Sequence, residues 1–306
     1  MLAAILLGLI QGLTAFIPVS SSGHLALGGA LLGMTGRGLA VDVALHMGTL
    51  GAVIVVFRTE LVGMADALLR RAGDPALRRL AGLLVVGTLP IVAVGPLVQP
   101  TVEQFAESPR TASALLLGTA ALLLAGEAWR RERIRRAAAP DPGAGKPTPA
   151  PTGEPVAAHA SASSASRQPL APRDPADPTG RGLEGLTVRG ALVIGVAQCF
   201  ALAPGISRSG STIAAGMVAG MTRAAATRFA FLLSLPALAG AAVLTLPDLG
   251  AAGTPPAGEV LAGALAAFVA GYAAIQLLLA LVTRVGLQGF AAYCVVVASI
   301  GLAVTA

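Results

Sequence analysis

Long apolar segments, separated by short polar ones, constrain the fold of this chain more than any other feature. Six of them are long enough to cross a lipid bilayer as helices, which takes about 20 apolar residues. They lie at about 40–57, 80–98, 110–128, 225–247, 258–283 and 287–305. The chain is 55% hydrophobic and only 12% charged, whereas soluble domains carry about 25% charged residues. We therefore predict an all-α integral membrane protein.

Four further apolar segments are shorter, and they come in two pairs. The first pair is 2–17 with 20–34, and the second is 187–203 with 207–221. Glycine, proline and serine interrupt both pairs, in the stretches PVSSSGH (18–24) and PGISRSGST (204–212). Segments of this length are more often re-entrant or interfacial than spanning. We predict two re-entrant helix pairs that turn back inside the membrane.

The two halves of the chain resemble each other at a constant offset of 187 residues. Nine identities fall within 28 positions at this offset, and three predicted spans follow each re-entrant pair. Shared breaks and shared order predict an internal repeat. The identities are Gly8 with Gly195, Gln11 with Gln198, Ser20 with Ser207, Ser22 with Ser209, Gly23 with Gly210, Gly29 with Gly216, and Gly33-Met34-Thr35 with Gly220-Met221-Thr222.

Residues 137–186 separate the two halves and differ from both in composition. They are rich in Ala, Pro, Ser and Gly and have almost no large apolar side chains. Such a segment cannot bury a core, so we predict a disordered cytoplasmic linker. The predicted organisation is a first membrane repeat at 1–136, the linker at 137–186, and a second membrane repeat at 187–306.

Basic residues predict how the chain is oriented, because they favour the cytoplasmic side of a membrane. Arginines flank several apolar segments, whereas the loops near 99–109 and 248–257 are acidic. These loops would lie outside, and the re-entrant pairs would enter from opposite faces as parts of an inverted repeat. The same pattern accounts for the net charge of +6, so we expect no nucleic-acid partner. The arginines are Arg58, Arg70, Arg71, Arg78, Arg79, Arg130, Arg131, Arg133, Arg135, Arg136, Arg223, Arg228 and Arg284.

Both broken turns carry side chains that suit phosphate. A helix N-terminus offers free N–H groups and a partial positive charge. Hydroxyl groups add further donors, and Arg208 offers a guanidinium fork that grips phosphate through two hydrogen bonds. An arginine at the bilayer centre costs about 2.5–3.5 kcal/mol on insertion scales, which marks it as functional. The hydroxyl residues are Ser20, Ser21 and Ser22 in the first turn, and Ser207, Ser209, Ser211 and Thr212 in the second.

Two histidines have more than one reading. His24 is a candidate acid, base or nucleophile. Asp42 and His46 lie four residues apart on one helix face, where they either join the site or only pair with each other. Serine and glycine in membrane segments also serve close helix packing. Their recurrence at equivalent repeat positions, once with His24 and once with Arg208, favours a site.

With these residues in view, the sequence resembles the undecaprenyl-diphosphate phosphatase family, membrane phosphatases linked to bacitracin resistance. LGLIQGLTAFIPVSSSGHL (7–25) is similar to the first signature of the family, and AQCFALAPGISRSGST (197–212) is similar to the second. VDVALHMGTLGAVIVVFR (41–58) and RFAFLLSLPALAGA (228–241) also look like family stretches. The resemblance covers nearly the whole chain apart from the linker.

The resemblance implies that the protein removes the terminal phosphate of a polyprenyl diphosphate at the outer face of the bacterial inner membrane. It implies Ser21 as nucleophile, His24 as general acid and base, and Arg208 as the phosphate-binding group, supported by Ser207 and Thr212. It also implies a divalent cation, Mg²⁺ or Ca²⁺, whose ligands the sequence does not identify. Oligomeric state is left open, with a homodimer as one alternative.

One departure from the family pattern concerns the first signature. The family usually has two glutamates four residues apart, where this chain has Gln11 and Ala15. General acid and base groups contribute roughly 10²- to 10⁴-fold to rates, so loss of the second carboxylate leaves a lipid-phosphate binder or translocase as an alternative. Retention of Ser21, His24 and Arg208 together favours the enzyme. A transporter of soluble ligands has less support, since it needs neither a nucleophile nor a phosphate-binding arginine. Asp42 is our hypothesis for a substitute carboxylate.

Overall fold

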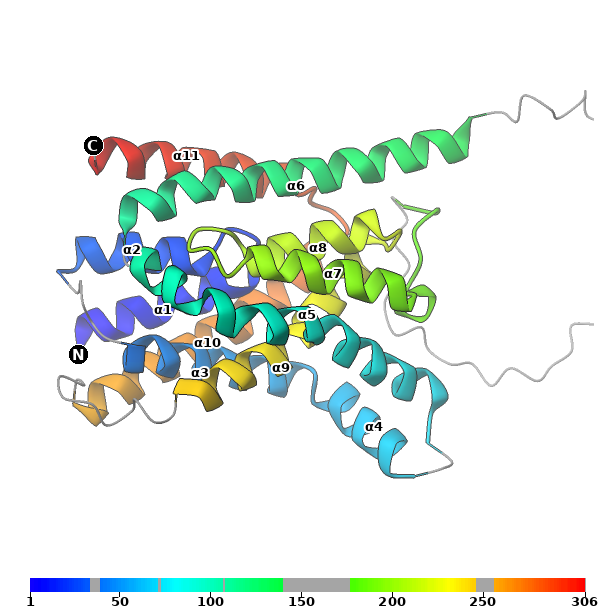
Figure 1. Cartoon of the computed structure of the whole chain (residues 1–306), viewed down its shortest axis with the longest axis horizontal. Coiled ribbons are helices and arrows are strands. Elements are labelled where there is room, and N and C mark those ends of the chain that lie inside the picture. Colours follow the sequence, from blue (N-terminus) through cyan, green and yellow to red (C-terminus); the bar gives the residue numbers. More distant parts are fainter. Residues whose placement is uncertain (34–38, 71–72, 107, 140–176, 246–255, 306) are drawn as a thin grey trace, which may run out of the picture.

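The computed structural model describes residues 1–33, 39–70, 73–106, 108–139, 177–245 and 256–305. Within these ranges the chain forms helices and no strands, which confirms the predicted all-α class (Figure 1). Most of the predicted linker, residues 140–176, lies outside the described residues, as do Glu107 and Asp248 of the two acidic loops.

The two predicted re-entrant pairs are present as short helices. Helices α1 (Leu2–Phe16) and α2 (Ser21–Leu31) form the first pair, and α7 (Val188–Phe200) and α8 (Arg208–Val218) form the second. The first pair enters from the end of the bundle that holds the N-terminus, and the second enters from the opposite end (Figure 1). The inverted repeat itself stays a prediction, and opposed entry of the two pairs is one of the features it implies.

The turns of the two pairs meet in the middle of the bundle. The Ser22 hydroxyl accepts a hydrogen bond from the Gly205 backbone N–H (3.1 Å), and the Ser209 hydroxyl donates one to the Ile17 carbonyl (3.3 Å). Backbone groups at helix breaks need partners that water cannot supply inside a membrane. Each turn therefore satisfies part of the broken backbone of the other.

Six longer helices surround the pairs: α3 (Leu39–Val56), α5 (Pro75–Ala106), α6 (Pro109–Ala138), α9 (Arg223–Thr245), α10 (Ala257–Leu281) and α11 (Gln288–Val304). Four stretches in the described ranges are long and apolar enough to span a membrane: Pro75–Val98, Pro109–Ala138, Arg223–Val243 and Ala257–Leu281. The protein is thus a multi-pass membrane protein. The other two predicted spans correspond to α3 and α11, which have 18 and 17 residues and are shorter than these four.

Glycine contacts couple each half of the chain to the other. A Cβ atom at Gly8 of α1 would lie 2.2 Å from the Gly263 carbonyl oxygen of α10. At the equivalent position of α7, a Cβ atom at Gly195 would lie 2.3 Å from the Gly87 carbonyl oxygen of α5. Small residues allow such close helix approach in membranes. The same contact thus occurs twice, each time between a re-entrant helix and a span of the other half.

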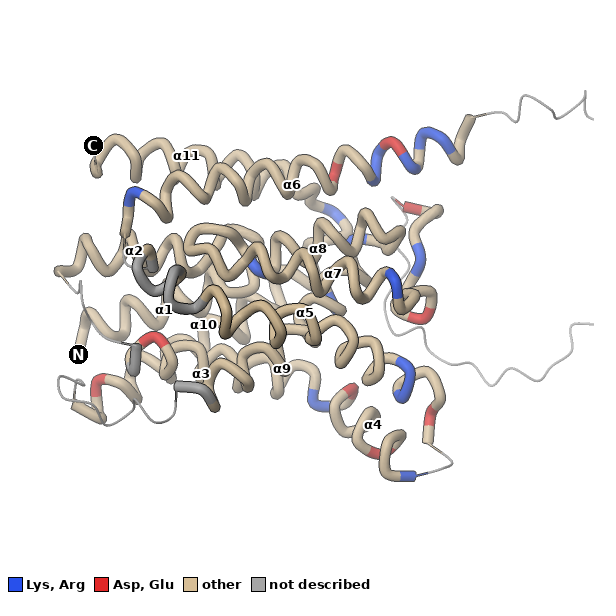
Figure 2. Tube along the Cα trace, in the orientation of Figure 1, with Lys and Arg blue, Asp and Glu red and all other residues tan. Residues whose placement is uncertain are grey.

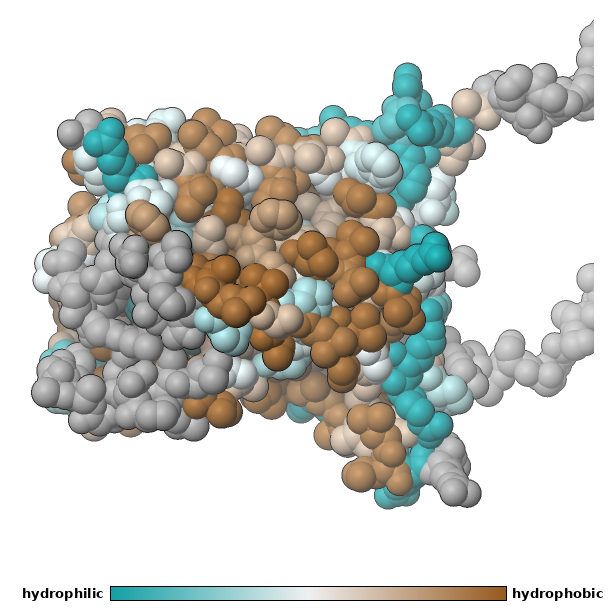
Figure 3. Space-filling view, in the orientation of Figure 1, coloured by the Kyte–Doolittle hydropathy of each residue, from teal (hydrophilic) through white to brown (hydrophobic). Residues whose placement is uncertain are grey.

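Charged residues gather at one end of the bundle. Figure 2 shows most of the arginines at the end from which α7 starts, next to helix α4 (Arg58–Leu69). The face in Figure 3 shows a hydrophilic band at this end and apolar side chains along the middle. This division fits a bundle whose long axis crosses a membrane.

The predicted linker is wrong at its C-terminal boundary, because residues 177–186 have a defined structure. They include the 3₁₀-helix η1 (Leu183–Gly185), and both Leu183 and Leu186 are buried. The buried carboxylate of Asp177 accepts a hydrogen bond from Arg133 of α6 (2.6 Å). A few anchoring side chains fix a segment whose average composition indicates disorder.

Candidate active site

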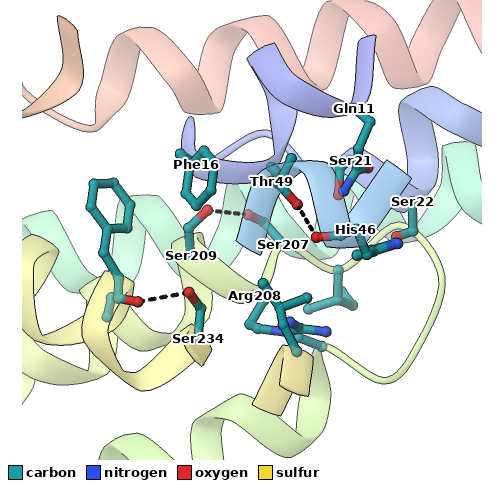
Figure 4. Close-up of a pocket in the computed structure, with 16 residues that line it drawn as sticks. Gln11, Phe16, Ser21, Ser22, His46, Thr49, Ser207, Arg208, Ser209 and Ser234 are labelled. Atoms are coloured by element: carbon teal, nitrogen blue, oxygen red, sulfur yellow. Dashed lines mark hydrogen bonds between the residues drawn. The ribbon is translucent and has the colours of Figure 1, made fainter. Parts of the chain in front are cut away.

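A cavity of 90 Å³ lies where the two broken turns meet (Figure 4). Both turns contribute to it, and α1, α3 and α9 close its sides. The lining residues are Gln11, Ala15, Phe16, Ser21, Ser22, His46, Thr49, Ala201, Ile206, Ser207, Arg208, Ser209, Ala230, Phe231, Ser234 and Leu238. Of the predicted site residues, the structure thus brings together Ser21, Ser22, Ser207, Ser209, Arg208 and Gln11.

The first turn holds Ser21 on a strained backbone. Ser21 is the first residue of α2, and its neighbour Ser20 caps the helix by accepting a hydrogen bond from the Gly23 backbone N–H (3.4 Å). Ser20 has φ 69° and is the one non-glycine with positive φ among the described residues. Such backbone strain costs about 1–3 kcal/mol and gathers at functional sites. Here it fixes the residue directly before the candidate nucleophile.

The second turn repeats this cap without the strain. Ser207 accepts a hydrogen bond from the Gly210 backbone N–H (3.0 Å), and its φ is −72°. The paired hydroxyls recur as well, since Ser207 and Ser209 are 3.2 Å apart and so are Ser20 and Ser22. The local structures of the two serine motifs therefore correspond, and only the one that carries Ser21 is strained.

Arg208 supplies the positive charge of the cavity. It is the first residue of α8, its buried Nε has no hydrogen-bond partner, and none of the ion pairs among the described residues involves it. A buried charge without a partner is costly. The cavity is therefore built to receive an anion.

Gln11 adds an uncharged polar group to the same cavity. Its side chain is 1% exposed, and neither amide atom has a partner in the described part of the chain. Buried polar groups in native proteins are nearly always hydrogen-bonded, so this amide is a candidate donor and acceptor for a group bound in the cavity. Figure 4 shows the Gln11 side chain pointing toward the space between Ser21 and Arg208.

Three predicted residues lie beside the cavity rather than in its lining. Ser20 and Thr212 act through the backbone, since Ser20 caps α2 and Thr212 donates a hydrogen bond to the Arg208 carbonyl (2.8 Å). Asp42 lies in the first turn of α3, and its carbonyl accepts a hydrogen bond from Nδ1 of His46 (2.7 Å). Of the two readings of this pair, His46 joins the cavity and Asp42 does not.

His24 also lies outside the lining. Its Nδ1 bonds to the Ser20 carbonyl (2.7 Å), and its Nε2 bonds to the Tyr293 hydroxyl of α11 (2.9 Å). The two rings are stacked, with centroids 5.6 Å apart. In this arrangement His24 holds the strained turn at Ser20 against α11.

Sequence reasoning missed four side chains of the cavity. Thr49 and Ser234 add hydroxyls from α3 and α9, and Phe16 and Phe231 add an apolar wall with ring centroids 5.4 Å apart. Each lies within a continuous apolar segment, where no break in the pattern marks it. Only their helical spacing relative to known site residues, such as Thr49 three residues after His46, could have indicated them.

The residues around the cavity do not fit a resident divalent cation. None of the lining residues is Asp or Glu, and no group of three or more His, Cys, Asp or Glu in the described ranges is arranged to hold a metal ion. Mg²⁺ and Ca²⁺ prefer carboxylate oxygens. The donor set thus lacks carboxylate ligands for the divalent cation that the family resemblance implied, and we derive no chemical step through a metal.

The fold and the cavity define a class of protein: all-helical membrane proteins whose broken helices meet at an anion-binding cavity. The chain belongs to the BacA family, since the family model described as "Bacitracin resistance protein BacA" matches residues 4–148 and 156–300.

Curated relatives cover nearly the whole chain. An undecaprenyl-diphosphatase of Geobacter sulfurreducens is 37% identical over 302 residues, which is 95% of this chain and 93% of the relative. The undecaprenyl-diphosphatase of Desulfatibacillum aliphaticivorans is 35% identical, covering 96% of this chain and 94% of the relative. That of Rubrobacter xylanophilus is 36% identical, covering 96% and 94%.

Proposed function

We propose that this protein is an undecaprenyl-diphosphatase, which hydrolyses undecaprenyl diphosphate to the monophosphate carrier lipid and inorganic phosphate. One observation carries the proposal. Ser21 and Arg208 are the first residues of opposed half-helices, and both line one cavity. A hydroxyl nucleophile and a phosphate-binding guanidinium thus meet at two helix N-termini, both of which favour anions. The relatives named undecaprenyl-diphosphatase support the same substrate.

The chemistry follows in two steps. The Ser21 oxygen attacks the terminal phosphorus, and the bond from this phosphorus to the bridging oxygen breaks. The bridging oxygen leaves with the electron pair as part of undecaprenyl monophosphate, and the Ser21 proton passes to a base. Water then attacks the phosphoserine, the bond between phosphorus and Ser21 breaks, the Ser21 oxygen takes back a proton, and inorganic phosphate is released. Arg208 and the two helix N-termini stabilise the charge on the phosphoryl oxygens in both steps.

Charge supports a site that faces the outer side of the bacterial inner membrane. The arginine-rich end of the bundle (Figure 2) is the cytoplasmic end by the positive-inside rule. The first re-entrant pair, which carries Ser21, enters from the other end (Figure 1). On this proposal a diphosphate headgroup of the outer leaflet reaches the cavity along α1 and α2.

The test is phosphate release from undecaprenyl diphosphate by the purified protein, compared with Ser21→Ala and Ser299→Ala. Ser299 lies exposed on α11, far along the chain from both turns, so its variant should match the wild type. Ser21→Ala should lose release, and mass spectrometry of wild-type protein quenched during turnover should find phosphate on Ser21. Binding of the lipid without release by the wild type would favour the lipid-phosphate binder or translocase instead.

A further inference from the structure

One imidazole lines the cavity, and it belongs to His46 rather than His24. His46 comes from α3 and shares the cavity with Ser21 and Arg208. Figure 4 shows it between the Ser21–Ser22 turn and Arg208. The phosphoryl transfer argued above therefore takes place beside this ring.

A backbone contact fixes the proton on the His46 ring. Nδ1 lies 2.7 Å from the Asp42 carbonyl oxygen. A carbonyl oxygen only accepts hydrogen bonds, so Nδ1 carries the proton of the neutral ring and Nε2 bears the lone pair. The partner of one ring nitrogen thus sets the role of the other, and Nε2 is the atom suited to take a proton.

The position of α3 supports this geometry. The His46 carbonyl accepts a hydrogen bond from the Thr49 hydroxyl (2.8 Å), and Thr49 lines the same cavity. Two residues from His46, a Cβ atom at Gly48 would lie 2.1 Å from the Ala264 carbonyl oxygen of α10. Such close packing holds the helix, and with it the ring, at a fixed distance from the cavity.

The other groups around the cavity are poorly suited to accept a proton. Apart from His46, the polar lining consists of serine and threonine hydroxyls, the Gln11 amide and Arg208. Arginine stays protonated, and amides and hydroxyls do not take up protons near neutral pH. Ala15 leaves the lining without the family's carboxylate. His24 is engaged at both nitrogens, with Nε2 accepting from the Tyr293 hydroxyl.

We propose that His46 is a further catalytic residue, the general base that takes the Ser21 proton through Nε2 as the oxygen attacks phosphorus. This inference rests on the proposed function. In the second step the attacking water gives its proton to the same nitrogen, after the first proton has left to the departing monophosphate. As the bond between phosphorus and Ser21 breaks, the same nitrogen returns this second proton to the Ser21 oxygen, so the ring ends each turnover with its starting charge. His24 is a positioning residue that holds the strained turn.

Two variants of His46 separate this role from packing. His46→Asn keeps an N–H donor for the Asp42 carbonyl but has no second ring nitrogen. His46→Ala leaves a space that an added imidazole can fill. We expect kcat for phosphate release to fall by roughly 10²- to 10⁴-fold in both, with KM changed by less than about threefold, because Arg208 and the helix N-termini remain. Thermal unfolding in detergent checks that each variant is folded.

Chemical rescue supplies the readout that packing alone would not move. Imidazoles of increasing basicity, added to His46→Ala, should restore phosphate release in the order of their basicity. If His46 only filled space, the restored release would instead depend on the size of the added imidazole. His24→Ala is the matched control, and its release should not follow the basicity of the additive. If His46→Ala does not fold, the base role is tested by kcat of His46→Asn alone, which should fall by roughly 10²- to 10⁴-fold.

The outcomes separate this inference from the proposed function. If the wild type releases phosphate and kcat of His46→Asn is within about threefold of the wild-type value, the base role is overturned. The proposed function then stays intact. Loss of release in folded His46→Ala without basicity-dependent rescue also overturns the base role, and makes His46 a positioning residue. A wild type that releases no phosphate overturns the function and this inference together. Loss of phosphate release in both His46→Asn and His46→Ala, with rescue of His46→Ala in the order of imidazole basicity, supports the inference.

Discussion

Ser21 and Arg208 occupy the same position in two half-helices that run apart from the middle of the bundle. They are also 187 residues apart, the offset that relates the two halves of the chain. The proposed nucleophile and the proposed phosphate-binding group thus lie at equivalent positions of the two halves and line one cavity. The two half-helices share a serine N-cap, Ser20 or Ser207, and differ at the next residue, which is Ser21 in one and Arg208 in the other.

Arg208 should tolerate no conservative replacement. Lysine keeps the charge but lacks the planar fork that forms two parallel hydrogen bonds with a phosphoryl group. We expect Arg208→Lys to lower kcat/KM for phosphate release by roughly 10²- to 10³-fold, the effect of losing one oriented donor at a developing anion. Arg189→Lys is the matched control, because Arg189 is exposed at the start of α7. Similar losses in both variants would contradict the assignment.

The strain at Ser20 should make its glycine variant more stable and less active. Glycine adopts φ 69° without steric cost, and losing a serine cap to glycine costs only a few tenths of a kcal/mol. We expect Ser20→Gly to gain about 1 kcal/mol in unfolding free energy, while kcat falls because the turn before Ser21 loosens. The thermal unfolding midpoint and phosphate release measure both effects.

Ser207→Gly provides the control with the opposite sign. Ser207 caps α8 in the same way, but its φ of −72° holds no strain to relieve. Its glycine variant should therefore unfold at a lower temperature than the wild type. An equal shift in both variants would show that the positive φ at Ser20 is not a source of strain.

Restoring the missing carboxylate should change the response to cations. Ala15 lines the cavity, so Ala15→Glu introduces the hard oxygen ligand that the lining lacks. We expect the purified Ala15→Glu protein to bind Mg²⁺ at least about tenfold more tightly than the wild type in a calorimetric titration, a typical effect of one group on metal affinity. Ala15→Gln has the same shape without the charge and should resemble the wild type. An unchanged Mg²⁺ affinity in Ala15→Glu would count against this account.

The buried carboxylate of Asp177 should matter for stability rather than for activity. It accepts a hydrogen bond from Arg133 and lies 3.6 Å from Nε of Arg130, and its side chain is fully buried. Removing one partner of a buried ion pair costs about 3–5 kcal/mol. Asp177→Asn should therefore lower the thermal unfolding midpoint, whereas Glu132→Gln, in an exposed cluster on α6, should leave it unchanged.

The sequence was most informative where its pattern was broken. Serine, glycine and proline within apolar segments marked both turns, and the 187-residue offset related the two turns to each other. Helix breaks in a membrane must satisfy their backbone groups locally, so the residues that do this are visible in the chain. The cap hydroxyls of Ser20 and Ser207 form the bonds that this reasoning requires.

Long-range packing was harder to foresee. Nothing in residues 41–58 shows that His46 points into a cavity while His24, inside a signature motif, is engaged by Tyr293 of a helix 269 positions later. The ordered segment 177–186 was also missed, because its stability comes from contacts of Asp177 and Leu183 with distant helices. The average composition of a segment does not reveal a few anchoring residues of this kind.

The mirrored glycine contacts have a consequence for biosynthesis. Helix α7 leaves the ribosome when its partner α5 is already made, so the Gly195–Gly87 contact can close at once. Helix α1 is made first, but its partner residue Gly263 follows 255 residues after Gly8, roughly 13–50 s later at ordinary elongation rates. The first re-entrant helix therefore waits in the membrane for nearly the whole of translation before α10 packs against it.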